Sequence, residues 1–158
     1  MIDELLDRFQ AGVAARDAGA IGAVCAPDLH YEDPFLPEPL TGPGALAEHA
    51  EQLWAAFPDA RIEANGPRLH DGRFLAAPVK LVGTHRGELA GLPPTGRFVV
   101  VQAVLFGELD AAGERLFRIR AFLDAYEAGV QVGVLPARGT LGARAMLALR
   151  GFGLRLTP

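Results

Sequence analysis

The fold is decided by residues 74–108, which read FLAAPVKLVGTHRGELAGLPPTGRFVVVQAVLFGE. Two runs rich in β-branched and aromatic residues, 74–88 and 96–108, flank the turn signal Gly91-Leu92-Pro93-Pro94. This arrangement predicts two long antiparallel strands. Working outward, we expect further strands near 60–70 and 114–126. Pro78 inside the first long strand indicates an edge position or a bulge.

Helical spacing dominates the chain before these strands. Apolar residues recur every three or four positions over residues 2–16, which predicts an amphipathic helix, and a short helix is expected at 18–25. Residues 29–33 predict a short strand, and a third helix should run from 41 to 57. Helices followed by an antiparallel meander indicate an α+β fold, not the alternating βαβ order of a nucleotide-binding domain.

Composition limits the class of protein. A chain of 158 residues that is 50% hydrophobic suits one globular domain, which we expect at 1–136, with a helical extension at 137–158 as part of it. The formal net charge of −4 argues against a nucleic-acid partner. With no membrane span or signal-peptide pattern evident, we expect a cytoplasmic protein. Cys25 is the single cysteine, which excludes an internal disulfide and a cysteine-based metal site.

The candidates for acid–base chemistry are carboxylates and one histidine, because there is no serine and the four histidines show no metal-ligand spacing. If 114–126 is one strand, Arg120, Phe122, Asp124 and Tyr126 share a face. In a cavity, desolvation between the two aromatic rings would raise the pKa of Asp124 and make it a useful acid or base. Alternatively, Asp124 is a surface carboxylate paired with Arg120.

Three other positions carry side chains of interest. Asp33 follows Tyr31 at the end of a predicted strand, where it is either a base at a pocket rim or the start of a turn. His85 falls on an apolar strand face, as a catalyst or as a core residue. Gln102 lies among apolar residues, where its amide would orient a substrate or bond a neighbouring side chain.

A resemblance to a known family rests on three motifs. GTHRGELAGLPPTGR at 83–97 strongly resembles the GTHxGxxxGxPPTGr segment of SnoaL-like polyketide cyclases, which belong to the NTF2-like superfamily. RAFLD at 120–124 and QVGVLP at 131–136 resemble two further family motifs. The resemblance spans about residues 5–136. It implies a cone in which a curved antiparallel sheet wraps around a hydrophobic pocket and N-terminal helices close it.

The resemblance also implies a chemistry. An Asp at the position of Asp124 acts in the family as general acid and base for an intramolecular aldol closure, without metal or cofactor. The implied substrate is a small hydrophobic molecule with carbonyl groups, polyketide-like or polycyclic. Further catalytic candidates are Asp33 and His85. The side chains expected to bind or orient the substrate are Phe9, Tyr31, Trp54, Gln102, Arg120 and Phe122.

Three alternatives stay open. Glu32-Asp33-Pro34 resembles the EDP of ketosteroid isomerase, although Phe9 and Gln102 stand near the positions of its oxyanion-hole Tyr and Asp. An epoxide hydrolase needs an Asp–Arg–Asp set, part of which Arg120 and Asp124 supply. The third alternative is a non-catalytic small-molecule binding protein, since one fold hosts many functions.

The end of the chain raises further expectations. From Ala128 onward there are four arginines and no Asp or Glu, which indicates a solvated basic segment or a contact with an anionic surface. Leu141, Ala145, Leu149 and Phe152 recur at helical spacing and predict a helix that packs on the pocket mouth or on another subunit. By analogy with the family, we expect a homodimer.

Overall fold

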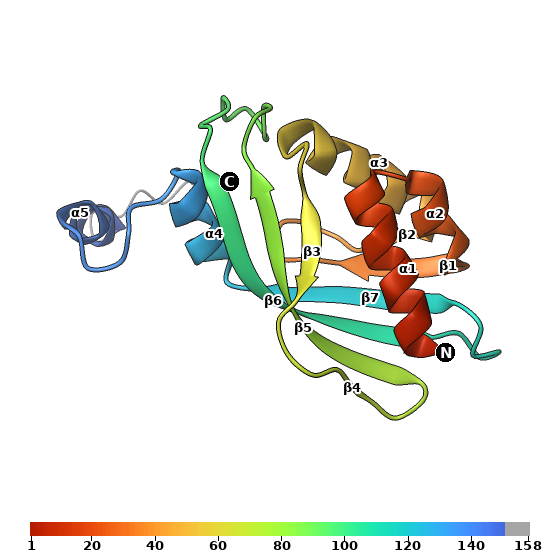
Figure 1. The fold of residues 1–158 in the computed structure, drawn as a ribbon. Helices are drawn as coiled ribbons and strands as arrows, with labels where there is room; N and C mark the ends of the chain where they lie inside the picture. The colour runs from red at the N-terminus through yellow and green to blue at the C-terminus, as the bar shows by residue number, and fades with distance from the viewer. Residues whose placement is uncertain (151–158) are drawn as a thin grey trace, which may run out of the picture.

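The computed structural model describes residues 1–150 as an α+β fold with a curved sheet (Figure 1). Both features confirm the prediction. The elements are, in chain order, α1 (Ile2–Ala15), α2 (Ala18–Ala23), β1 (Cys25–Glu32), β2 (Leu40–Thr41), α3 (Gly42–Ala56), β3 (Arg61–Ala64), β4 (Leu69–His70), β5 (Phe74–Thr84), β6 (Phe98–Leu109), β7 (Leu116–Leu123), α4 (Ala125–Val132) and α5 (Leu141–Arg150).

One seven-stranded sheet forms the centre of the molecule. Its order is β2-β1-β7-β6-β5-β3, with β4 also paired to β5. β5, β6 and β7 are antiparallel neighbours, which confirms the predicted meander. β1 pairs with the free side of β7 in parallel, with Glu32 opposite Arg120. This parallel pair was not predicted from the sequence.

The helices α1, α2 and α3 lie on one face of the sheet (Figure 1). Every second strand residue points toward them, as Leu75, Ala77 and Val79 of β5 do, and these join Phe9 and Trp54 in the main hydrophobic core. α4 packs against β6 in a second, smaller core. Packed apolar side chains therefore occupy this side of the sheet.

Several strand boundaries differ from the prediction. The strand expected at 60–70 is two short strands, β3 and β4, and the one expected at 114–126 ends at Leu123. β5 is not an edge strand, but Pro78 lies between the stretches that pair with β4 and with β3. The Pro78 carbonyl accepts a hydrogen bond from the Asn65 N–H at 2.9 Å, so the missing N–H of Pro78 falls at this break in the ladder.

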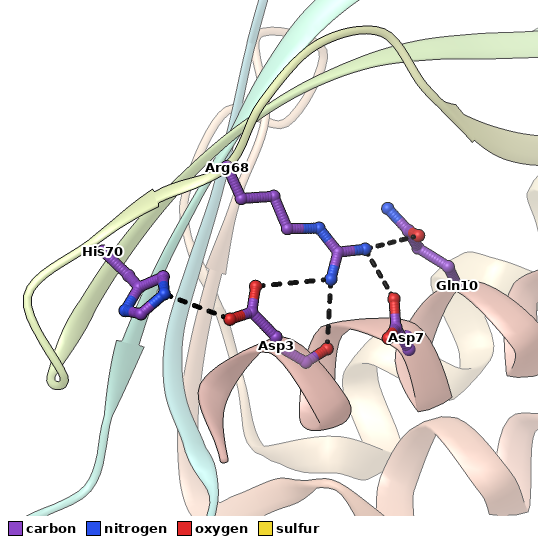
Figure 2. Close-up of polar contacts among 5 residues, drawn as sticks. All are labelled: Asp3, Asp7, Gln10, Arg68 and His70. Carbon is purple, nitrogen blue, oxygen red and sulfur yellow. Dashed lines mark hydrogen bonds and ion pairs between the residues drawn. The ribbon is translucent and has the colours of Figure 1, made fainter.

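A polar cluster fastens α1 to the segment around β4 (Figure 2). The Arg68 guanidinium donates to the Asp7 carboxylate at 2.6 Å, to the Gln10 side-chain oxygen at 3.2 Å and to the Asp3 backbone carbonyl at 3.2 Å. His70 Nε2 lies 3.2 Å from the Asp3 carboxylate. The N-terminal helix is thus held to the sheet by polar contacts as well as by the core.

α5 stands apart from the rest of the molecule (Figure 1). It confirms the predicted C-terminal helix, although Phe152 lies outside the described residues. No helix or strand within residues 1–150 packs along it, so it does not cover a pocket mouth there. Among the described helices, none has the length and apolar character that a membrane span needs.

Candidate functional site

The catalytic candidates lie at one end of the sheet. β1, β5 and β7 all run toward this end, because β1 is parallel to β7 while β5 and β7 are both antiparallel to β6. Asp33 follows β1, His85 follows β5 and Asp124 follows β7. Residues that follow the strands of a rigid sheet are common positions for binding and catalysis. Asp33 and Asp124 therefore follow neighbouring strands, whereas His85 lies further along the sheet, because Thr84 pairs with Phe98 of β6 and Leu123 pairs with Ala103.

Asp33 is held in an enclosed position by two hydrogen bonds. One carboxylate oxygen accepts from the Phe35 backbone N–H at 2.8 Å, and the other lies 3.1 Å from His49 Nε2 on α3. The Asp33 side chain is 7% exposed, against 47% for Asp124. An ionised carboxylate only accepts hydrogen bonds, so His49 Nε2 is the donor. In a neutral imidazole, Nδ1 of His49 then keeps the free lone pair.

The surroundings keep Asp33 ionised. Burial alone would raise its pKa, but the hydrogen bonds from His49 and from the Phe35 N–H, together with the charge of His49, outweigh burial and lower the pKa. Burial and, next, the Asp33 charge raise the pKa of the Tyr31 hydroxyl, which therefore stays protonated. The Tyr31 and His49 rings touch, with centroids 5.6 Å apart. A carboxylate, an imidazole and a neutral phenol thus meet at this point.

A hollow of about 170 Å³ opens beside Asp33. Glu32 on its wall forms an ion pair with Arg120 at 2.7 Å. A water molecule occupies roughly 30 Å³ in the liquid, so the hollow has room for one ring or polar group of a ligand. The residues that line it are Glu32, Asp33, Leu36, Pro37, Glu38 and Pro39.

The segment at 83–97 is anchored at the end of α3. The Thr95 backbone N–H lies 3.2 Å from His85 Nδ1, and the Thr95 hydroxyl lies 3.0 Å from the same nitrogen. Gly87 approaches α3 so closely that an added Cβ would collide with the carbonyl oxygen of Ala55. His85 is fully buried, and its Nε2 has no hydrogen-bond partner among the described residues. Of its two sequence interpretations, the geometry matches the core residue.

The structure contradicts the environment expected for Asp124. The chain leaves the sheet after Leu123, because the Asp124 carboxylate accepts a hydrogen bond from the Glu127 backbone N–H at 3.0 Å and caps α4. Tyr126 therefore lies in a helix and not beside Asp124 on a strand. The bond from Glu127, and also the Arg138 guanidinium at 2.9 Å, lower the pKa of Asp124 where a raised one was expected.

The other predicted binding residues divide between the two sides of the sheet. Gln102, Arg120 and Phe122 lie on the outer face, away from the helices, whereas Phe9 and Trp54 are buried in the core. The alternation of residues along the strands correctly predicted which of them share a face of the sheet. The wholly apolar set of β7 takes the inner side as expected, and Phe122 on the other face is exposed to solvent.

Within residues 1–150, the side chains that two of the alternative reactions need are not arranged for those reactions. Gln102 faces away from the core that contains Phe9, so the two do not form an oxyanion site of the ketosteroid-isomerase kind. Arg120 binds Glu32 and Arg138 binds Asp124, so Arg120 and Asp124 form no Asp–Arg–Asp set. Within residues 1–150, no group of three or more potential metal-ligating side chains gathers.

The match to known families agrees with this architecture. Residues 3–131 match the family model described as SnoaL-like polyketide cyclase, which is most of the chain. The chain belongs to the SnoaL-like polyketide cyclase family. A comparison with curated proteins finds no match.

Solved structures similar to this SnoaL-like protein show the same fold at low identity. AclR from Streptomyces galilaeus, provisionally assigned as a hydroxylase, is 20% identical with a TM-score of 0.72, over 85% of this chain and 96% of AclR. IdmH from Streptomyces antibioticus, provisionally assigned as a polyketide cyclase, is 19% identical with a TM-score of 0.70, over 84% and 98%. A protein with a ketosteroid isomerase-like fold from Catenulispora acidiphila is 15% identical with a TM-score of 0.70, over 87% of this chain and 97% of that protein.

His49 is the site residue that sequence reasoning missed. It falls within the predicted third helix, but no role was predicted for it. No local motif joins it to Asp33, because their contact arises only when α3 packs on β1. The sequence contained one indication of this contact: a histidine lies on the predicted helix that follows the strand ending at Asp33-Pro34.

Proposed function

We propose that this SnoaL-like protein is a cofactor-independent cyclase or isomerase that acts by proton transfer on a small hydrophobic substrate with carbonyl groups, polyketide-like or polycyclic. Family membership supports the class of reaction. The observation that carries the proposal is the contact of His49 with Asp33, which itself lines a hollow. An imidazole oriented by a carboxylate is suited to proton transfer near neutral pH.

The proposed reaction uses His49 as base and then as acid. Nδ1 of His49 accepts the proton from a substrate carbon between two carbonyls, and the C–H electron pair becomes an enolate. Asp33, bound to Nε2–H, stabilises the imidazolium. The enolate carbon bonds to a second carbonyl carbon of the same molecule, whose oxygen becomes an alkoxide. His49 returns the proton to this oxygen, so atoms and charge balance.

The family resemblance assigns the same proton transfer to Asp124. That carboxylate lies at the same end of the sheet, but it is solvated, caps a helix and pairs with Arg138. We assign the role to Asp33–His49 because charges interact more strongly in an enclosed site than in water. The two assignments predict that different variants lose activity.

The test is mass spectrometry of diketones, anthracycline-type precursors, β,γ-unsaturated ketosteroids and epoxides incubated with the wild type and its variants. We expect a product of unchanged mass, or one lacking a water, formed about 10²–10⁴ times more slowly by His49→Gln and Asp33→Asn. Asp110→Asn, in an exposed turn, is the matched control.

Other results would redirect the assignment. Loss of activity in Asp124→Asn alone would move the proton transfer to Asp124, and a product that has gained water would indicate a hydrolase. If panel members quench the fluorescence of Trp54, the single tryptophan, without being converted, the protein is a binding protein.

A further inference from the structure

We infer that Tyr31 is a positioning residue for proton transfer: its hydroxyl donates to the Asp33 carboxylate and limits how strongly that carboxylate holds the proton on His49. This inference rests on the proposed function, in which Asp33 acts on His49. The sequence predicted that Tyr31 binds the substrate. Its ring packs against the main hydrophobic core, and the residues that line the hollow do not include it. Tyr31 therefore acts through Asp33.

The surrounding strands and helix fix the place of Tyr31. On β1 it pairs with Leu40 of β2 on one side and with Ile119 of β7 on the other. Its ring contacts the His49 ring of α3, with centroids 5.6 Å apart and planes inclined at 47°. A ring held by two strands, the core and a helix has little freedom to turn, so its hydroxyl keeps one position.

The position of this hydroxyl suits a hydrogen bond to Asp33. Asp33 directly follows β1, two residues after Tyr31, and its carboxylate is within hydrogen-bonding reach of the hydroxyl. Burial and, next, the charge of Asp33 raise the pKa of the phenol, which stays neutral beside an ionised carboxylate. A neutral phenol can donate, whereas an ionised carboxylate only accepts. The donor is therefore Tyr31.

The carboxylate of Asp33 can accept from three donors at once. They are the Phe35 backbone N–H at 2.8 Å, His49 Nε2–H at 3.1 Å and the Tyr31 hydroxyl. The two carboxylate oxygens offer about four acceptor sites. Each donor stabilises part of the negative charge, so the bond from Tyr31 weakens the bond that Asp33 makes with Nε2–H. In the proposed reaction this matters because His49 must return the proton that it takes up.

The other charged groups around Asp33 do not supply this donor. Glu32 forms an ion pair with Arg120 at 2.7 Å, and Glu38 is the further carboxylate on the wall of the hollow. An ionised carboxylate cannot donate to another. The N–H of Phe35 belongs to the backbone, which side-chain substitutions leave in place. Tyr31→Phe therefore removes one donor from Asp33 while the contact with His49 remains.

Proton NMR of the histidine rings tests this inference without a substrate. The Nε2–H signal of His49 is assigned by its loss in His49→Gln. In Tyr31→Phe the bond from Nε2–H to Asp33 should shorten, and the signal should move downfield. Tyr126→Phe, which removes a hydroxyl that donates to the Pro136 carbonyl at 2.7 Å, is the matched control and should leave the signal in place. The circular dichroism of both tyrosine variants should match the wild type.

Two NMR results would overturn the inference. An unchanged signal in Tyr31→Phe would show that the hydroxyl does not share the carboxylate. A signal that moves upfield would show that the variant only loosens the contact between Asp33 and His49, which is the result expected of a purely structural residue.

Kinetics separates this inference from the proposed function. With a substrate that the wild type converts, Tyr31→Phe should lower kcat about tenfold and leave KM unchanged, because return of the proton slows while the contacts with substrate remain. A raised KM with an unchanged kcat would overturn the inference in favour of substrate binding by Tyr31. If the wild type converts no substrate, the proposed function fails, and the NMR signal still decides whether Tyr31 donates to Asp33.

Discussion

The backbone N–H of Thr95 points at Nδ1 of His85 from 3.2 Å, which makes this nitrogen an acceptor and places the proton of the neutral ring on Nε2. The contact joins the two ends of the loop that carries the most specific family motif. In this structure the histidine of GTHRG and the threonine of PPTG close the loop, and the N–H groups of Arg86 and Gly87 bond it to the Ala56 carbonyl at the end of α3. The motif that identifies the family therefore has a structural role, which is to hold this loop in place.

Removing this contact should destabilise the fold. Thr95→Val loses the hydroxyl and should lower the free energy of unfolding by about 1 kcal/mol, while His85→Ala, which also empties a fully buried position, should cost about 3 kcal/mol. Urea unfolding measures both. Thr41→Val, an exposed threonine whose side chain makes no capping bond, is the control. Equal stability of all three variants would refute this explanation of the motif.

The close approach of Gly87 to α3 predicts that no larger residue fits. Gly87→Ala should lower the free energy of unfolding by about 1–3 kcal/mol, because the new Cβ collides with the Ala55 carbonyl. Gly44→Ala in α3, where an added Cβ meets nothing within 4 Å, should raise it by about 0.5–1 kcal/mol. Thermal unfolding of the two variants checks the opposite signs.

The Arg68 cluster should contribute more than an ordinary surface ion pair. Arg68→Met leaves Asp7 and Gln10 without their partner and should cost about 1–2 kcal/mol, with faster hydrogen exchange in α1. Arg61→Met, which removes an exposed pair with Glu63, should cost at most about 0.5 kcal/mol. Similar losses for the two variants would show that the cluster does not stabilise α1.

Acid should weaken the fold through Asp33. Its pKa is lowered in the folded state, so its contribution to stability is present above the unfolded pKa of about 3.9 and is lost as pH falls through the folded pKa. Asp33→Asn should therefore flatten the fall of unfolding free energy between about pH 4 and the acid limit. Asp28→Asn, exposed on β1, is the matched control. An unchanged slope for Asp33→Asn would contradict this assignment.

The spacing of apolar residues predicted the fold because the buried side chains follow the same spacing. The alternation of β5 and the helical spacing of α1 and α3 reflect which side chains enter the core, and a one-residue slip would reverse the strand faces. The end of β7 was missed although Asp124 and Glu127 have the spacing of a helix-capping pair. The strand was predicted to run past this capping pair because its end was judged from β propensity alone. The Asp33–His49 pair is a tertiary contact, which no window of sequence contains.

The parallel pairing of β1 with β7 has a consequence for how the chain reaches its native state. The register joins Cys25 to Leu116, so most of the polypeptide forms a loop that must close before the edge made by β1 and β2 can dock. Such non-local contacts slow folding, because the chain loses conformational entropy before the contacts form and stabilise it. On the ribosome, β1 must wait until β7 has been synthesised. Until then its apolar residues remain without their final neighbour and are available to chaperones or to other nascent chains.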